Sequence, residues 1–104
     1  MIHVLATAPI KTGCLEAALA CYRLLVPEVR AREAGCIAYV PTVDLSLGLP
    51  NQDEEASTIV VIECWNAVAD FRRHLEMDHC VEFRRRIAPY MRGGIRVRIV
   101  RDAL

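Results

Sequence analysis

Residues suited to acid–base chemistry and to holding a flat ligand gather in the stretch IVVIECWNAVADFRRHLEMDHC, residues 59–80. Glu63 and Trp65 stand at its start, and His74 and His79 follow. A histidine can accept a proton near neutral pH, a tryptophan offers an aromatic wall, and a buried carboxylate has to be paired or hydrogen-bonded. The stretch therefore has two interpretations, the wall of a ligand pocket or ordinary core packing.

The strand expected over residues 58–65 leaves both interpretations open. Alternation places Glu63 and Trp65 on one face with Ile59 and Val61. Glu63 is then either a buried polar group or a strand-end residue that reaches solvent or pairs with an arginine. Trp65 is either core between sheet and helix or an aromatic wall.

The two histidines belong to a helical region that is split in two. Phe71 and His74 share one face of a helix ending near residue 76, and Phe83 lies on the apolar face of a second helix that starts with His79. A helix start lowers the pKa of a nearby imidazole and favours the neutral form, which suits a general base. A purely structural role is the ordinary alternative for either histidine.

Several other chemistries are not indicated. The H-x4-H spacing spans a helix break, offers no obvious third ligand, and is accompanied by scattered cysteines, so we expect no metal site. There is no glycine-rich phosphate loop and no serine in a nucleophile-elbow context. The third strand carries no exposed aromatics for stacking bases, so RNA recognition is not expected.

The elements that must position these residues follow from hydrophobic periodicity and turn residues. The order is β-α-β-β-α-β, which predicts an α+β fold, a ferredoxin-like sandwich with its second helix split. Thr12, Asn66 and Asp78 are the expected N-caps, and Gly35 is the expected end of the first helix. The strands are expected at 2–8, 36–44, 58–65 and about 95–99, and the helices from about 13 to 35, 66–76 and 79–88.

Composition sets further limits. The 104 residues predict a single domain, residues 1–104, and 54% of them are hydrophobic, a surplus that a subunit interface would cover. The sheet has helices on one side only, so we expect a homodimer with the two sheets face to face. A formal net charge of zero indicates neither nucleic acid nor membrane as a partner, and the odd number of cysteines, five, is typical of a reducing, cytoplasmic location.

Three segments together resemble the antibiotic biosynthesis monooxygenase domain family: MIHVLATAPIKTG, VPEVRAREAGCIAYVPTVD and IVVIECWNAVADFRRHLEMDH. The resemblance runs from Ile2 to about Val100 and rests on E-x-W at the end of the third strand, on HL ahead of the second histidine, and on GC-x-x-Y at the start of the second strand. The segment GCIAYVPTVD with its long following loop is most similar to the quinol monooxygenases of that family.

The resemblance implies a dimeric α+β barrel with a ligand cavity between sheet and helices in each subunit. It implies a cofactor-independent monooxygenase that oxidises a quinol or a related aromatic or polyketide-like compound with dioxygen. The alternatives are a non-catalytic ligand-binding or interaction domain and a haem-handling protein; the haem-degrading members carry an Asn where this chain has Thr7. The catalytic base is expected to be His74 or His79, and the expected substrate contacts are Trp65, Phe71, Tyr39, Thr7, Glu63 and Phe83.

Overall fold

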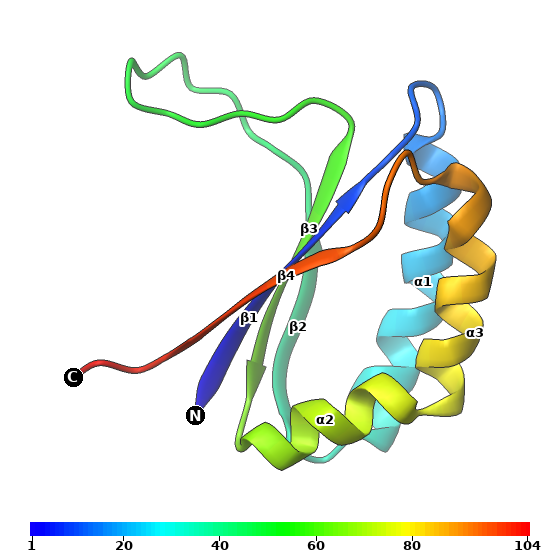
Figure 1. Ribbon diagram of the computed structural model, residues 1–104, viewed down its shortest axis with the longest axis vertical. Helices are drawn as coiled ribbons and strands as arrows, with labels where there is room; N and C mark the ends of the chain where they lie inside the picture. The colour runs from blue at the N-terminus through cyan, green and yellow to red at the C-terminus, as the bar shows by residue number, and fades with distance from the viewer.

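The computed structural model describes all residues, 1–104, and its four strands form one antiparallel sheet in the order β2-β3-β1-β4. The helices cover a single face of this sheet (Figure 1). The strand and helix order confirms the predicted ferredoxin-like α+β fold, including the split second helix. The elements are β1 (Ile2–Pro9), α1 (Leu15–Arg32), β2 (Cys36–Thr42), β3 (Thr58–Trp65), α2 (Val68–Glu76), α3 (Asp78–Ile87), a 3-10 turn (Ala88–Tyr90) and β4 (Arg96–Arg101).

The helix starts differ from the sequence prediction. Cys14, Ala67 and Met77 flank the three helices, and none of them makes a side-chain capping bond. The capping roles predicted for Thr12 and Asn66 are therefore wrong. Tertiary packing of the apolar helix faces replaces the local capping interaction, since most helix stability in proteins comes from packing. Asp78, also predicted as a cap, is instead the first residue of α3, where its negative charge interacts favourably with the positive end of the helix dipole.

Gly35 has a different function from the helix-ending one predicted for it. Helix α1 ends earlier, at Arg32, and Glu33 follows as its flanking residue. A Cβ atom at Gly35 would lie 2.2 Å from Cγ of Asp70, far inside contact distance. The carbonyl of Gly35 accepts a hydrogen bond from the amide of Asn66 at 2.9 Å. Gly35 is thus needed because α2 begins directly against the turn that precedes β2.

Strand β3 alternates as predicted and forms the centre of the core. Val61, Glu63 and Trp65 are buried on the face that the helices cover, while Ile62 on the other face is 48% exposed. The carboxylate of Glu63 is thereby brought among apolar side chains beneath the helices. The chain itself covers only one side of this strand.

Strand β2 contains an irregularity that the sequence did not indicate. Cys36 pairs with Trp65 and Ala38 pairs with Cys64, so Ile37 is an extra residue that interrupts the register. Such a bulge shifts the alternation by one position. As a result Ile37 is 49% exposed, whereas Tyr39, two positions later, is buried beside Glu63.

The uncovered face of the sheet carries a continuous apolar stripe across three strands, formed by Val40, Ile62 and Leu5. Ile62 is the cross-strand neighbour of both Val40 and Leu5. All three side chains are more than one-third exposed. None of the helices is long and apolar enough to cross a membrane.

Candidate active site

A cavity of about 220 Å³ lies between the sheet and the helices α1, α2 and α3. Most of its lining residues are hydrophobic, and the polar and ionisable ones come from separate elements. The structure brings five of the predicted site residues to this cavity: Tyr39, Glu63, Phe71, His74 and Phe83. An apolar pocket with a few convergent polar groups is the usual form of a small-molecule site.

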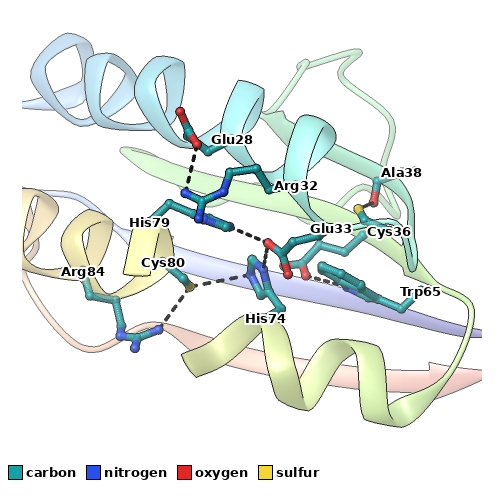
Figure 2. Close-up of polar contacts among 11 residues, drawn as sticks. Glu28, Arg32, Glu33, Cys36, Ala38, Trp65, His74, His79, Cys80 and Arg84 are labelled. Carbon is teal, nitrogen blue, oxygen red and sulfur yellow. Dashed lines mark hydrogen bonds and ion pairs between the residues drawn. The ribbon is translucent and has the colours of Figure 1, made fainter. Parts of the chain in front are cut away.

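Two histidines and one glutamate form a buried cluster beside the cavity (Figure 2). Nδ1 of His74 lies 2.8 Å from Oε2 of Glu33, and Nε2 of His79 lies 2.7 Å from the same oxygen. All three side chains are less than one-tenth exposed. A buried carboxylate accepts and does not donate, so each imidazole presents an N–H to Glu33.

This bonding fixes the reactive nitrogen of His74. With its proton on Nδ1, the neutral ring has its lone pair on Nε2, which lies 3.7 Å from Sγ of Cys80, and His74 lines the cavity. Burial lowers the pKa of His74, against the opposing effect of Glu33, so the ring is neutral near pH 7. The Glu33–His74 pair is therefore arranged as an oriented general base.

His79 has a different position from the one its predicted role requires. Its Nε2 is committed to Glu33, and its Nδ1 is buried without a hydrogen-bond partner. His79 does not line the cavity. It lies between α3 and α1, beside a separate surface hollow that residues of these two helices form. The structure thus gives His79 a positioning contact with Glu33, while only His74 reaches the cavity.

The break between α2 and α3 allows both histidines to meet one carboxylate. Met77 has an extended backbone, with φ −65° and ψ 141°, and its amide bonds to the carbonyl of His74 at 3.2 Å. The second helix restarts at once with Asp78, which turns His79 toward Glu33. A continuous helix would place residues five apart on different faces.

Trp65 is packed against the residues of the site but does not line the cavity. Its side chain is fully buried, and its Nε1–H donates a hydrogen bond to Oε1 of Glu63 at 3.0 Å. The ring packs against His74 with centroids 4.7 Å apart. Trp65 is absent from the cavity lining, so its predicted role as an aromatic wall is replaced by core packing and one hydrogen bond.

Glu63 presents its second carboxylate oxygen without a protein partner at the cavity. Burial raises the pKa of Glu63 to about 7, partly opposed by the hydrogen bond from Trp65 and reinforced by the charge of Glu33. The carboxyl group therefore exchanges between its neutral and charged forms near neutral pH. It can donate or accept a hydrogen bond to a molecule in the cavity.

Thr7 is the predicted contact that the structure does not bring to the cavity. Its neighbour Ala6 lines the cavity, and alternation along β1 turns Thr7 to the opposite face of the sheet. There it lies beside the acidic loop residues Asp53 and Glu54 in a separate surface hollow. Thr7 has no access to a molecule bound near His74.

The donor atoms of Glu33, His74 and His79 lie within 4.8 Å of one another, a spacing that could hold a metal ion. The sequence suggested no third ligand, and the fold supplies Glu33 from another element. In the structure both imidazoles direct an N–H to Glu33, so an ion would have to displace these protons. These hydrogen bonds account for Glu33 and for one nitrogen of each imidazole, whereas Nδ1 of His79 has no partner.

Sequence reasoning missed three residues of the site: Glu33, Cys80 and Arg84. Glu33 lies 41 positions before His74, and no periodic signal joins them. Cys80 and Arg84 could have been found, because residues 80, 83, 84 and 87 lie on one side of a helix. That spacing places Cys80 beside the predicted Phe83.

Known proteins resemble this chain in sequence and in fold. "Probable quinol monooxygenase YgiN" of Escherichia coli (strain K12) is 36% identical over 64 residues, which is 62% of this chain and 61% of that relative. The match thus spans about three-fifths of the relative's length. A solved structure described as antibiotic biosynthesis monooxygenase superposes with a TM-score of 0.80 at 29% identity, covering 100% of this chain and 99% of the other. A protein from Shewanella oneidensis superposes with a TM-score of 0.77 at 26% identity, covering 95% and 87%.

The sequence profile of the antibiotic biosynthesis monooxygenases matches residues 1–86. The matched part contains the whole cluster described above, from Glu33 through His74 to Arg84. The fold agrees as well, since the superposition with the second of these proteins covers 100% of this chain. Because the profile matches residues 1–86, which is most of the chain, the protein belongs to the antibiotic biosynthesis monooxygenase family.

Proposed function

We propose that this single domain is a monooxygenase that oxidises a quinol or a related small aromatic compound with dioxygen, without metal, flavin or haem. The observation that carries the proposal is His74, which lines an apolar cavity while its Nδ1 is held by the buried Glu33. The name of the Escherichia coli relative, a probable quinol monooxygenase, supports the same reaction class.

The first step is removal of a phenolic proton by His74. A quinol hydroxyl near Nε2 passes its proton to the neutral imidazole, and Glu33 stabilises the resulting imidazolium through the Nδ1–H bond. The apolar surroundings contain little to solvate the new phenolate. This makes the anion electron-rich and reactive toward dioxygen.

The second step is transfer of an electron from the anion to dioxygen, which forms a radical pair. Recombination forms a carbon–oxygen bond, and loss of water leaves an oxygenated quinone, so one oxygen atom enters the ring and one enters water. The substrate supplies all the electrons. Glu63 and Arg84 line the cavity and provide donors that hold the reduced oxygen.

The size of the cavity favours a compact substrate. Its volume of about 220 Å³ is below the roughly 300–1,000 Å³ of sites for drug-sized ligands. Tyr39, Phe71 and Phe83 contribute aromatic surface to the walls. A molecule with one or two fused rings fits this description best.

The proposal is tested by oxygen uptake. The chelator-treated protein, free of flavin and haem by its absorbance spectrum, should accelerate oxygen consumption by a reduced naphthoquinol above the rate in buffer. Because burial lowers the pKa of His74, the rate should rise with pH at values below the ordinary 6.5. Rates equal to the buffer control across a panel of quinols and phenols would favour the ligand-binding alternative. A Soret band on titration with haemin would favour the haem-handling one.

The protein is also proposed to act as a homodimer that pairs its sheets. The helices leave one face of the sheet bare (Figure 1). The exposed side chains of the apolar stripe, Val40, Ile62 and Leu5, belong to that face. Exposed apolar surface of this kind marks an interface. A C2 pairing would bury the stripe against its own copy.

Sedimentation velocity at micromolar concentration should show a dimer. Ile62→Glu should give a monomer, because two facing carboxylates would be buried without partners. Leu24→Glu is the matched control: Leu24 is 57% exposed on α1, on the helical side of the molecule, and its variant should stay dimeric. A wild-type protein that sediments as a monomer would contradict the proposed interface.

A further inference from the structure

Cys80 is a cavity residue to which the proposed oxidation gives no role. The side chain lies on α3, is 5% exposed, and lines the cavity. Its Sγ atom is 3.7 Å from Nε2 of His74 and 3.1 Å from Nη1 of Arg84. Nη2 of Arg84 donates to the carbonyl of Leu75 at 2.8 Å, and this bond holds the guanidinium charge beside the sulfur.

Hydrogen bonds link Glu33, His74, Cys80 and Arg84 in this order (Figure 2). His74 donates from Nδ1 to Glu33, so its Nε2 can accept the thiol proton of Cys80. Arg84 donates to the sulfur and favours its thiolate form. A nucleophile, a base and a group that orients the base are the three parts of an activated nucleophile.

We propose that Cys80 is a covalent attachment site for quinones and similar α,β-unsaturated carbonyl compounds that enter the cavity. The compounds are recognised by the same aromatic walls as the substrate. That the quinone is the protein's own product rests on the proposed function; the reactivity of Cys80 does not. Formation of the adduct fills the cavity and stops turnover.

The reaction is a conjugate addition that needs no outside oxidant or reductant. The sulfur attacks a ring carbon of the quinone while His74 takes the thiol proton. The electron pair of the carbon–carbon double bond moves to the carbonyl oxygen, which receives the proton held by His74. Transfer of the ring proton from the attacked carbon to the second carbonyl oxygen restores the aromatic ring. The product is a thioether of the hydroquinone: one S–H and one ring C–H bond are broken, one S–C and two O–H bonds are formed, and the quinone is reduced by the two electrons of the thiol.

The site is selective because the thiol is protected until a ligand reaches it. Burial raises the pKa of the Cys80 thiol, and the charge of Arg84 only partly opposes this. Reagents in bulk solvent therefore meet a buried, protonated thiol. A quinone seated in the cavity meets the sulfur and its base together.

Cys21 provides a matched comparison inside the same chain. It is 8% exposed, and burial raises the pKa of its thiol too. Its Sγ donates to the carbonyl of Ala17, and it neither lines the cavity nor contacts a base. A cysteine that is merely buried should behave as Cys21 does.

The test uses the purified full-length protein and 1,4-benzoquinone at less than one equivalent, followed by peptide mass mapping of each cysteine. The adduct should form at Cys80 at least about tenfold faster than at Cys21. In a second series, with the quinone varied in excess over the protein, the rate at Cys80 should saturate. Cys80→Ser should abolish the adduct at this position. His74→Asn should slow it by roughly 100-fold or more, the usual cost of a lost base. Arg84→Gln should slow it as well, while the rate at the partly exposed Cys14 stays unchanged.

Equal rates at Cys80 and Cys21 in the wild-type protein would overturn the proposal, and this comparison needs no variant to fold. An unchanged Cys80 rate in a folded His74→Asn protein, checked by its melting curve, would overturn it too. The assay supplies the quinone ready-made, so it is independent of oxygen uptake. Oxygen uptake without an adduct removes only this inference, and an adduct without oxygen uptake removes only the proposed function.

Discussion

His74→Ala should lower the rate of quinol-dependent oxygen uptake by roughly 100- to 10,000-fold, the range for loss of a general base. His74 is the histidine that lines the cavity, and Glu33 holds its proton on Nδ1, which leaves Nε2 as the basic nitrogen. The loss should appear mainly in kcat, because the proton moves in the transition state while the aromatic walls still bind substrate. Initial rates with an oxygen electrode measure it.

Two other histidine variants control this result. His3 lies on β1, is paired with Asp102 at 2.6 Å, and has a side chain that is 40% exposed, so His3→Ala should retain the wild-type rate. His79→Ala should reduce the rate less than His74→Ala does, because it removes a contact to Glu33 and leaves the base in place. If His74→Ala consumes oxygen as fast as the wild type above buffer, His74 is not the base.

Glu63→Gln should make the protein more stable at alkaline pH, by up to about 3 kcal/mol at pH 8. Burial raises the pKa of Glu63 from an ordinary 4.5 to about 7, so the folded state binds more protons than the unfolded state between these values. The contribution of Glu63 to stability is therefore greatest below pH 4.5 and is lost as the pH rises to about 7. Glutamine has no charge to desolvate and can still accept the hydrogen bond of Trp65.

Urea unfolding at several pH values measures the difference between Glu63→Gln and wild type. This difference isolates Glu63, because the lowered pKa of His74 affects both proteins, which lose its contribution as the pH falls below about 6.5. Glu54→Gln is the control, since Glu54 lies in the exposed loop after β2 and should leave the curve unchanged. A difference that is the same at pH 4.5 and pH 8 would contradict the raised pKa.

The sequence by itself determined the layers of this protein and much of the cavity wall. Period-two alternation in β3 placed Glu63 and Trp65 on one face, and helical spacing placed Phe71 beside His74. These patterns are local and repeat with the geometry of the backbone, so they can be read from one chain. The family resemblance was found in the same way, through motifs that stay in order along the sequence, and the reaction class proposed above rests on it.

Only the tertiary structure decided which of these residues share a site. The partner of both histidines is Glu33, at the far end of α1, and no local pattern links residues so distant in sequence. The helix break at Met77 determines that His74 lines the cavity and His79 does not. The same packing turns Trp65 from a wall into a support for Glu63 and brings Cys80 to the base. Whether side chains from separate elements point toward one another depends on how the helices pack on the sheet. A sequence pattern does not contain this information.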